Sequence, residues 1–485
     1  MSSTHYADRN GCALHGVIKV LDAIQGVVPI VHANAGCSLN GRFSANTLNG
    51  AIGRYFRSPL EQGATTLFDK HVVFGGTARL REQIKNSVKV LQGDLYVVAT
   101  GCVPEIIGDD LPAMVKEARE QRFPVLGITS PGFKGNAYTG YAASLKALLV
   151  GIDDLFPKEA SERTGKRVNL LGLVPEQDPF WEGDLLELEQ ILASVGLQSN
   201  RLLGQGQDVR SWKQARHADL SLVLSPWGHE AAAYLQSQHQ VPTLDLGWLP
   251  VGSRDAGQLL EQLARRLELD EQQLDAAKRQ LDGHQRYYLQ KAATTWLSQD
   301  LQKRSVIVAP SATAVGLARF LAGTLGHPLP VVVITDDPDE SRRDALQHAI
   351  HEQSPSSQVW FSSSQQQIAE LLHNAVPEFI FASHLEQPTA RALHVPLLEI
   401  ATPVRQSLIL QRNYAGVQGA LSLVEDFSAA VLQANQEAAR TPIATTGVNT
   451  QLLASKIWQE RRGRGSSNRS STEPDSPAAL SPIAS

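Results

Sequence analysis

The sequence predicts an α/β protein built from parallel sheets. Short runs rich in Val, Ile and Leu recur along the chain, and each is followed by a Gly, Pro, Ser or Thr turn and then by a helix-like pattern. Continuous apolar runs of this kind are typical of strands that helices cover on both faces. The predicted strands lie at residues 27–32, 95–99, 125–128, 168–173, 220–224, 305–308, 331–334 and 379–381.

The chain of 485 residues is too long for one hydrophobic core, and its pattern predicts three α/β blocks followed by a tail. The first block, residues 1–160, carries every cysteine and ends in a polar linker over 157–166. The second block, 161–302, ends in a long polar helical region, and the third block covers 303–460. The tail, 461–485, is rich in Arg, Gly, Ser and Pro, and we expect it to be disordered.

Charge and hydropathy exclude two classes of partner. The net charge of −5 gives no broad cationic surface, so nucleic acid is not an expected partner. The sequence has no apolar run of about 18 residues and no N-terminal secretory pattern, so no membrane is expected as a partner either. We therefore expect a cytoplasmic protein, and in that reducing compartment cysteines indicate metal or redox chemistry rather than disulfides.

Three cysteines, Cys12, Cys37 and Cys102, lie on glycine-flanked segments near the start of the chain. Cys37 and Cys102 follow predicted strands, where parallel sheets form ligand sites, and Cys12 precedes a helical stretch. Neighbouring glycines let the backbone approach a bulky cofactor and donate to its sulfur atoms. The residues alone leave an iron–sulfur site and buried structural thiols open. A metal site with His15 or His32, or a lone nucleophilic cysteine, is less favoured because no CxxC pair occurs and no thiol is distinguished.

Several segments together resemble the component 1 subunits of the nitrogenase superfamily. The pattern His-x4-Cys, followed later in the chain by Cys-x5-Gly-Asp-Asp, is specific to these proteins. A weaker likeness runs through residues 225–227, 396–400 and 414–419, so that the resemblance covers nearly the whole chain except the tail. The main matching segments are residues 31–37, 73–76, 102–110 and 130–135.

This resemblance implies a nitrogenase component 1 fold with three doubly wound α/β domains. It implies that Cys12, Cys37 and Cys102 are one subunit's three ligands to an iron–sulfur cluster shared with a partner subunit. The cluster would be of the eight-iron P-cluster type (8Fe-7S) or of a four-iron type (4Fe-4S). Gly132 stands where some β-type subunits carry a serine that ligates the oxidised cluster, so this ligand exchange is not expected here.

The resemblance also assigns the chain to the β-type subunits, which relay electrons. In α-type subunits a second-domain cysteine and a third-domain histidine hold the substrate-reducing metallocofactor. Here Ser225 stands at the first position, and the segment 413–416 contains no histidine. An α-type sister subunit in an α2β2 heterotetramer would therefore hold that cofactor, and this chain would contribute no catalytic residue. An ATP-dependent iron protein would deliver the electrons and dock at Phe74, since this chain has no Gly-x4-Gly-Lys-Ser/Thr loop.

Two departures from the family pattern leave the activity open. The segment between Cys37 and Phe74 is longer than in typical β-type subunits, and few residues precede Cys12. These departures favour a divergent nitrogenase-like reductase, such as the methylthio-alkane reductase type, or a scaffold subunit for cofactor assembly. The resemblance does not distinguish dinitrogen from an organosulfur compound as substrate.

Other polar and aromatic residues of the matching segments have competing interpretations. Phe74 is either a docking residue or a core phenylalanine before a tight turn. Asp109 and Asp110 are expected to cap the helix that starts near residue 111. His32 is expected to be a hydrogen-bonded core residue, and Glu105 either tunes the cluster or is solvated or capping.

Overall fold

The computed structural model describes residues 9–40, 62–156, 163 and 165–440. The chain divides into two units, residues 1–434 and 435–485, and the fold described below belongs to the first. The predicted tail, most of the predicted linker and residues 41–61 of the long segment after Cys37 lie outside the described residues.

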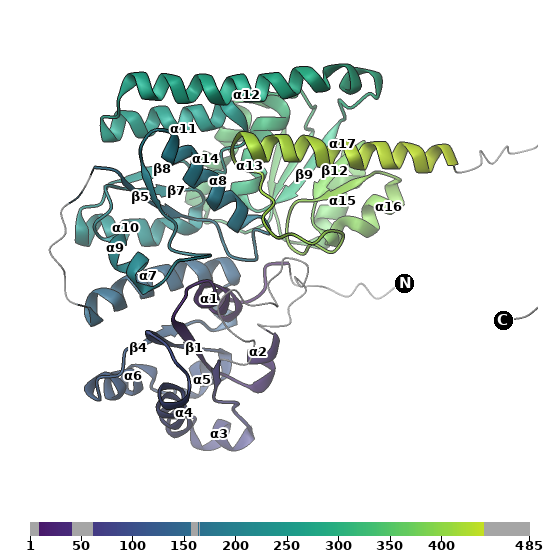
Figure 1. The fold of residues 1–485 in the computed structure, drawn as a ribbon. Helices are drawn as coiled ribbons and strands as arrows, with labels where there is room; N and C mark the ends of the chain where they lie inside the picture. The colour runs from purple at the N-terminus through teal and green to yellow at the C-terminus, as the bar shows by residue number, and fades with distance from the viewer. Residues whose placement is uncertain (1–8, 41–61, 157–162, 164, 441–485) are drawn as a thin grey trace, which may run out of the picture. The chain divides into compact units, whose positions relative to one another are not determined.

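Three sheets follow one another along the chain, and all their paired strands run parallel (Figure 1). Their strand orders are β2-β1-β3-β4, β6-β5-β7-β8 and β11-β10-β9-β12-β13. In each sheet the chain winds first to one side and then to the other, so the predicted doubly wound α/β class is confirmed. The order reverses between β1 and β3, between β5 and β7, and between β9 and β12, and such reversal points are where ligands bind in open α/β sheets.

The strands of each sheet come from one of the three predicted blocks. The first sheet contains β1 (Val27–His32), β2 (Gly63–Ala64), β3 (Leu95–Thr100) and β4 (Val125–Thr129). The second contains β5 (Arg167–Leu171), β6 (Gln198–Asn200), β7 (Leu220–Val223) and β8 (Thr243–Asp245). The third contains β9 (Ser305–Ala309), β10 (Val331–Ile334), β11 (Gln358–Phe361), β12 (Phe379–Ala382) and β13 (Leu397–Glu399). Whether the blocks fold as separate domains stays a prediction.

Helices connect the strands and cover the sheets. Around the first sheet lie α1 (Ala13–Asp22), α2 (Ala35–Asn40), α3 (Asp69–Phe74), α4 (Thr77–Val90), α5 (Cys102–Ile107), α6 (Leu111–Glu120) and α7 (Ala137–Leu155). The second block adds α8 (Trp181–Ser194), α9 (Val209–Ala215), α10 (His229–His239), α11 (Gly252–Leu267) and α12 (Glu271–Ser298). The third adds α13 (Ser311–Gly323), α14 (Glu340–His351), α15 (Gln365–Ala375), α16 (Gln387–Leu393) and α17 (Gly416–Arg440).

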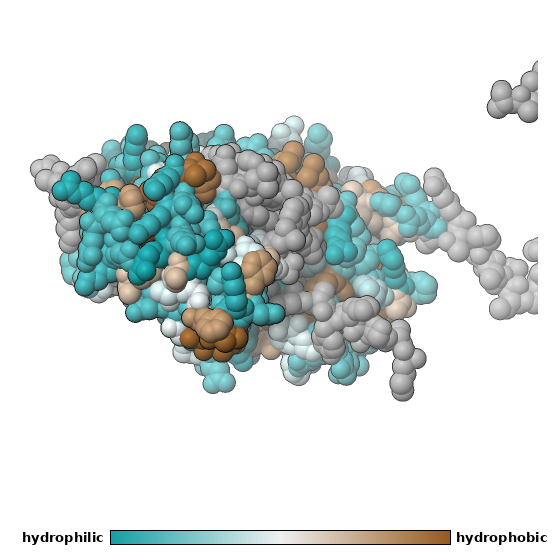
Figure 2. All heavy atoms as spheres, turned by 90° about the horizontal axis from the view of Figure 1, so that it is seen from below, coloured by the Kyte–Doolittle hydropathy of each residue, from teal (hydrophilic) through white to brown (hydrophobic). Residues whose placement is uncertain are grey.

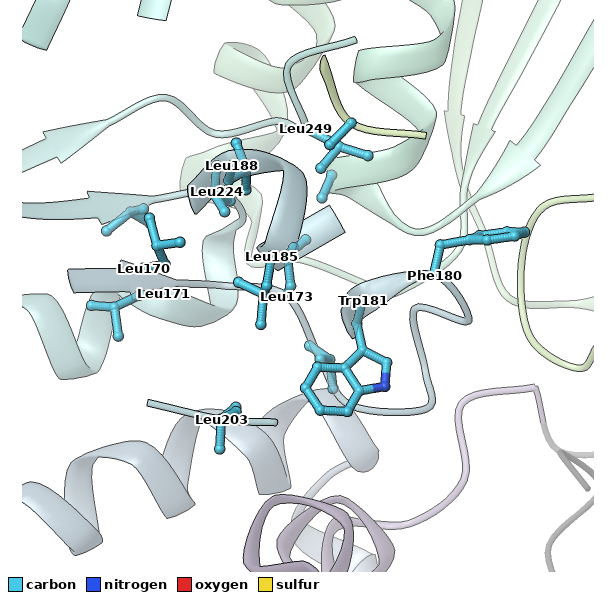
Figure 3. Close-up of a cluster of buried hydrophobic side chains, with 14 of the residues drawn as sticks. Leu170, Leu171, Leu173, Phe180, Trp181, Leu185, Leu188, Leu203, Leu224 and Leu249 are labelled. Carbon is cyan, nitrogen blue, oxygen red and sulfur yellow. The ribbon is translucent and has the colours of Figure 1, made fainter. Parts of the chain in front are cut away.

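The central strands are buried along their whole length, as their continuous apolar runs predict. Every residue of β1, β3, β7, β9, β10 and β12 is buried, because helices cover both faces of each sheet. Figure 3 shows the packing beside the second sheet, where Leu185 and Leu188 of α8 lie among Leu170 and Leu171 of β5 and Leu224 just after β7. This core places the carboxyl ends of the strands, and the loops that follow them, at defined positions.

Some helices are buried almost completely and others are largely exposed. Along α13 the residues from Ser311 to Leu321 are all buried, whereas α12, the predicted polar helical region, buries only Ala277 and Gln285. No helix among the described residues is both long and apolar enough to cross a membrane.

Candidate iron–sulfur site

The three cysteines lie at the carboxyl edge of the first sheet. Cys37 is on α2, which follows β1, and Cys102 is the first residue of α5, which follows β3 directly. Since β1 and β3 are the neighbours between which the strand order reverses, these two thiols flank the reversal point of the sheet. Cys12 is the N-cap residue of α1, and its extended backbone (φ −113°, ψ 162°) starts that helix.

Gly132 lies beside two of the thiols, those of Cys12 and Cys102. It begins a short 3-10 turn (Gly132–Lys134) after β4, and its N–H donates to Cys102 Sγ at 3.2 Å. A Cβ at position 132 would lie 3.0 Å from Cys12 Cβ, 3.5 Å from Cys102 Sγ and 3.7 Å from Cys12 Sγ. The absence of a side chain here therefore leaves the space between Cys12 and Cys102 open.

Cys37 interacts with the other two thiols through charge. Burial raises the pKa of Cys12, and the charges of Cys37 and Cys102 raise it further, against the lowering effect of the backbone N–H groups of His15 and Leu14. Burial and the charge of Cys102 also raise the pKa of the Cys37 thiol. Burial and the neighbouring charges therefore favour the neutral thiols at Cys12 and Cys37, and a bound cation such as iron would favour the thiolates instead.

The residues present fit an iron–sulfur cluster better than a single metal ion. Within the described ranges, no group of three His, Cys, Asp or Glu side chains is placed to hold one metal ion. The irons of a cluster lie apart, so thiolate ligands to a cluster need not converge on one point. All three thiols are free and partly exposed, which leaves access for ligands from another chain. Cys12 and Cys37 also pack against the hydrophobic core, so the choice between cluster ligands and structural thiols stays a prediction.

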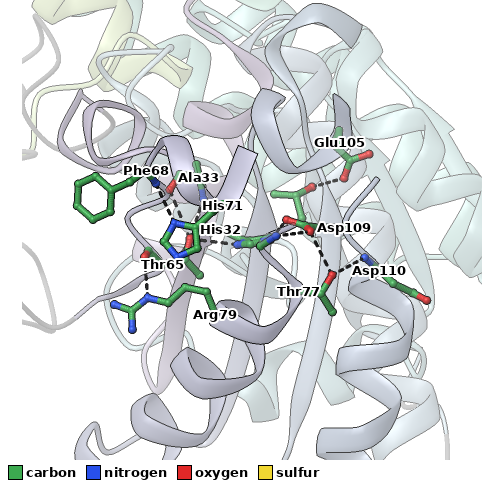
Figure 4. A network of polar contacts seen from close by, with 12 residues as sticks. His32, Ala33, Thr65, Phe68, His71, Thr77, Arg79, Glu105, Asp109 and Asp110 are labelled. Carbon is green, nitrogen blue, oxygen red and sulfur yellow. Dashed lines mark hydrogen bonds and ion pairs between the residues drawn. The ribbon is translucent and has the colours of Figure 1, made fainter. Parts of the chain in front are cut away.

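His32 is a hydrogen-bonded core residue, as expected (Figure 4). Its Nδ1 lies 3.0 Å from Thr65 Oγ1 and its Nε2 lies 3.0 Å from Asp109 Oδ2, so both ring nitrogens have partners. Burial lowers the pKa of His32, although the Asp109 carboxylate opposes this shift. With both nitrogens occupied, His32 is not placed as a metal ligand.

The expectation for the two aspartates was right for Asp110 and wrong for Asp109. Asp110 caps α6, because its Oδ1 accepts the N–H of Ala113 at 2.9 Å. Asp109 instead accepts the N–H of Gly76 at 2.7 Å and the Thr77 hydroxyl at 3.1 Å, at the start of α4. Its partners are distant in sequence, so the local pattern of a cap before a helix could not identify them.

Glu105 is engaged within the same loop region. Its carboxylate accepts a hydrogen bond from the Thr100 hydroxyl at the end of β3 (Figure 4). This contact ties α5 back to the strand that precedes Cys102, and a role of Glu105 in tuning a cluster stays a prediction.

Phe74 is on the surface and not in the core. Its side chain is 88% exposed, and the neighbouring Val73 and Phe68 are 73% and 61% exposed. Figure 2 views the protein from the side on which α3 lies in Figure 1 and shows brown hydrophobic patches among hydrophilic residues. An exposed cluster of large apolar side chains is a feature of interaction sites.

The two positions that the resemblance compares with cofactor ligands of α-type subunits, Ser225 and the segment 413–416, carry no thiol or imidazole. Ser225 follows β7 and is buried, and its hydroxyl donates to Gly172 O at 2.5 Å across the reversal point. The segment 413–416 is held by Asp184, whose Oδ1 accepts the N–H groups of Tyr414 and Ala415 at 2.7 and 2.8 Å. Both places are filled by the chain's own hydrogen bonds.

A buried lysine near Cys12, Lys19, was not identified from the sequence. Lys19 lies on the same helix, α1, and is buried among apolar residues, which lowers its pKa, while Glu176 and Cys12 act to raise it. The signal was present in the sequence, because Lys19 interrupts the apolar run Val17-Ile18-Lys19-Val20-Leu21.

Comparison with known proteins identifies relatives over most of the chain. The family model described as nitrogenase component 1 type oxidoreductase matches residues 12–432. A nitrogenase molybdenum-iron protein beta chain of Methanothermobacter thermautotrophicus is 25% identical over 461 residues, which cover 87% of this chain and 93% of that protein. The beta chain of Methanococcus maripaludis is 23% identical over 457 residues, with the same coverage. A solved structure titled nitrogenase Cp1 at pH 6.5 superposes with a TM-score of 0.73 at 17% identity, over 89% of this chain and 94% of that one.

Proposed function

The chain belongs to the family of nitrogenase component 1 type oxidoreductases, and from this premise we propose that it is a β-type subunit that relays electrons. Its Cys12, Cys37 and Cys102 hold one half of an interface iron–sulfur cluster of the eight-iron P-cluster type or of a four-iron type. When bound, the cluster takes up and passes on single electrons. The observation that supports this proposal is the placement of three partly exposed thiols on the first block, with Cys37 and Cys102 on the helices after β1 and β3 and with Cys12 and Cys102 both beside Gly132.

The residues around the thiols have defined tasks in this function. The N–H of Gly132 donates to Cys102 Sγ and so stabilises negative charge on that sulfur, which tunes the potential of a bound group. The absence of a side chain at Gly132 keeps the space beside Cys12 free. The buried pair of His32 and Asp109 fixes the loops after β1 and β3, and thereby the backbone that carries Cys37 and Cys102.

The proposed partners are inferred from ligand residues that two positions of this chain do not carry and from apolar side chains that α3 exposes. Neither Ser225 nor the segment 413–416 offers a cysteine or histidine, so the substrate-reducing cofactor belongs to an α-type sister subunit in an α2β2 heterotetramer. The exposed Phe74 and Val73 are the docking surface for an ATP-dependent iron protein. Phe74→Ser should then slow electron delivery while the iron content stays at the wild-type level, and unchanged electron delivery would remove Phe74 from the docking surface. The expected cytoplasmic location stays a prediction.

The long segment between Cys37 and Phe74 and the few residues before Cys12 favour a divergent reductase or a second candidate, a scaffold subunit on which the metallocofactor is assembled. A scaffold would use the same three thiols. The two candidates differ in turnover: a reductase complex consumes electrons and reduces a substrate, such as dinitrogen or an organosulfur compound, whereas a scaffold complex holds clusters without turnover.

Metal analysis of the purified complex tests the proposal. The chain is produced with its sister subunit under anaerobic conditions, and iron and acid-labile sulfide are measured for the wild type, Cys37→Ala and Cys102→Ala. We expect iron in the wild-type complex and a large loss in both variants. Ser225→Ala is the matched control, since it changes a residue at the corresponding edge of the second sheet. Wild-type iron in both cysteine variants would show that these thiols are not ligands.

A further inference from the structure

The residues just before Cys12 contact the third sheet, although Cys12 itself lies beside the first. Arg9 and Asn10 are both buried, although they lie at the beginning of the described chain. Arg9 precedes Cys12 by only three residues, so their Cα atoms are at most about 11 Å apart. Whatever holds Arg9 therefore restricts where the Cys12 thiol can lie.

Arg9 occupies the reversal point of the third sheet. Its NH1 donates to Ser383 Oγ at 3.2 Å and to Glu386 Oε2 at 3.3 Å, and its NH2 donates to Glu386 Oε1. Ser383 directly follows β12, which pairs with β9 where the strand order reverses. Both charged side chains are 3% exposed. The crevice in which a doubly wound sheet binds ligands thus contains an arginine of the same chain.

Glu386 is itself held in place to receive the guanidinium. Its Oε2 accepts the backbone N–H of Ser383 at 3.1 Å and the Ser383 hydroxyl at 2.8 Å. A carboxylate fixed in this way offers a planar, two-oxygen partner that matches the planar fork of arginine, and lysine cannot reproduce this arrangement.

Asn10 and Ala13 extend the connection as far as Cys12. Asn10 Nδ2 donates to Thr335 O at 2.7 Å, just after β10 of the third sheet, and Asn10 O accepts the N–H of Ala137 at 2.9 Å. On the other side of the thiol, the N–H of Ala13 donates to Gly135 O at 3.1 Å. Cys12 is therefore the middle of a short segment that the third sheet holds at one end and the start of α7 holds at the other.

We propose that Arg9 is a positioning residue for Cys12: by filling the crevice of the third sheet, it sets the place of the thiol at the edge of the first sheet. The identity of the group that Cys12 binds rests on the proposed function, but the positioning itself does not. It implies that a change in the loop at Ser383 and Glu386, far away in sequence, alters how one of the three thiols is presented.

The test uses the full chain in complex with its sister subunit and compares three changes. Arg9→Lys keeps the charge and removes the fork. The double variant Arg9→Met, Glu386→Leu removes both charges, so it leaves no unpaired buried ion if the single variant fails to fold. Arg319→Lys is the matched control, because Arg319 also forms a buried two-oxygen pair, with Asp255 at 3.1 to 3.2 Å, but between α13 and α11.

Two readouts separate positioning from general stability. In iron-depleted complex, mass spectrometry follows alkylation of each cysteine by a maleimide. We expect Cys12 to react roughly tenfold faster in both Arg9 variants and Cys102 to keep its rate, since only the segment around Cys12 opens more often. In iron-loaded complex, a chelator should remove iron several-fold faster from the same variants, and Arg319→Lys should leave both rates at the wild-type level.

The outcomes distinguish this inference from the proposed function. A wild-type complex without iron would contradict the proposed function, while the alkylation rates would still test the positioning of Cys12. If the wild type holds iron but Cys12 reacts at the wild-type rate in both Arg9 variants, the inference is wrong. Equal acceleration at Cys12 and Cys102 would also overturn it, because Arg9 would then act only on overall stability.

Discussion

The reversal point of the first sheet differs from those of the second and third in what fills it. All three sheets share one winding pattern, so their reversal points are equivalent places. At the first, Cys37 and Cys102 are partly exposed and free. At the second, the Ser225 hydroxyl bonds to Gly172 O, and at the third, Arg9 binds Ser383 and Glu386.

This difference shows that the same sheet topology can leave its reversal point open to a ligand or fill it with hydrogen-bonded groups of the chain itself. A crevice whose space is taken up by the chain's own hydrogen-bonded polar groups contributes to stability instead of binding a ligand. A crevice with unpaired thiols and a missing side chain at Gly132 is left for a ligand. The predictions below test this contrast, starting with the largest expected effect.

Filling the open crevice should remove the bound group. Gly132→Val places a branched side chain where even a Cβ would lie 3.0 Å from Cys12 Cβ, so we expect most of the iron to be lost from the purified complex. The fold should survive, because overpacking typically costs only about 1–3 kcal/mol. Gly36→Ala is the control, since a Cβ there meets nothing within 4 Å even though Cys37 is adjacent. Full iron content in Gly132→Val would show that the crevice is not the site.

The stability of the loops beside the open crevice should depend on the Asp109 carboxylate. Asp109→Ala leaves the N–H of Gly76, the Thr77 hydroxyl and His32 Nε2 without their acceptor, so we expect roughly 2–4 kcal/mol of lost unfolding free energy. Asp110→Ala removes a single helix cap and should cost about 1 kcal/mol. Denaturant titration of the two variants gives both values, and equal losses would contradict the central role of Asp109.

The stability of the protein should depend on pH through Asp178, a buried carboxylic acid between β5 and α8. Burial raises the pKa of Asp178 to about 8, and the charges of Asp336 and Asp184 add to this shift, although the Val174 N–H opposes it. Between the unfolded pKa near 4 and the folded pKa, only the folded protein holds the proton, so this group makes stability fall as pH rises, by up to about 1.4 kcal/mol per pH unit.

Asp178→Asn should flatten this part of the pH profile. The amide can still accept the N–H of Val174 through its oxygen, as Asp178 Oδ2 does at 2.6 Å, but it does not ionise. We expect higher thermal stability than the wild type at pH 8 and little difference at pH 4. Parallel profiles for the two proteins would show that Asp178 is ionised in the folded chain at neutral pH.

The smallest effect is expected where a thiol is added to a closed crevice. Ser225→Cys should bind no additional iron, because the position is buried and its Oγ already contacts Gly172 O and the N–H of Trp227. Loss of the hydroxyl's hydrogen bond should lower the unfolding free energy by about 1 kcal/mol. Iron above the wild-type content in this variant would mean that residue type alone, and not the closure of the crevice, separates the first two sheets.

The central strands were predictable from sequence, and most of the edge strands were not. The run Val331–Ile334 is continuous and apolar, and it forms β10 with the predicted bounds. The edge strand β11 alternates between exposed and half-buried residues, and β2 has only two residues. Such short or half-exposed strands lack the continuous apolar run that marks a buried central strand.

The three cysteines of the candidate site were predictable from sequence, but the residues that hold the surrounding segments in place were not. Cys12, Cys37 and Cys102 could be selected because their residue type, glycine neighbours and family pattern all indicate one chemistry. Asp109 was assigned to the wrong helix, and Arg9 was not selected at all. The partners of Arg9 lie more than 370 positions away along the chain, where no local pattern can indicate them.

By itself, the sequence determined the α/β class, the central strands and the three thiols of the first block. These features depend on local periodicity and on residue chemistry, which short segments carry on their own. Only the tertiary structure decided which crevices are open and which are closed. That outcome depends on hydrogen bonds between segments far apart in sequence, such as Arg9 with Glu386, and those partners meet only once the three sheets have packed.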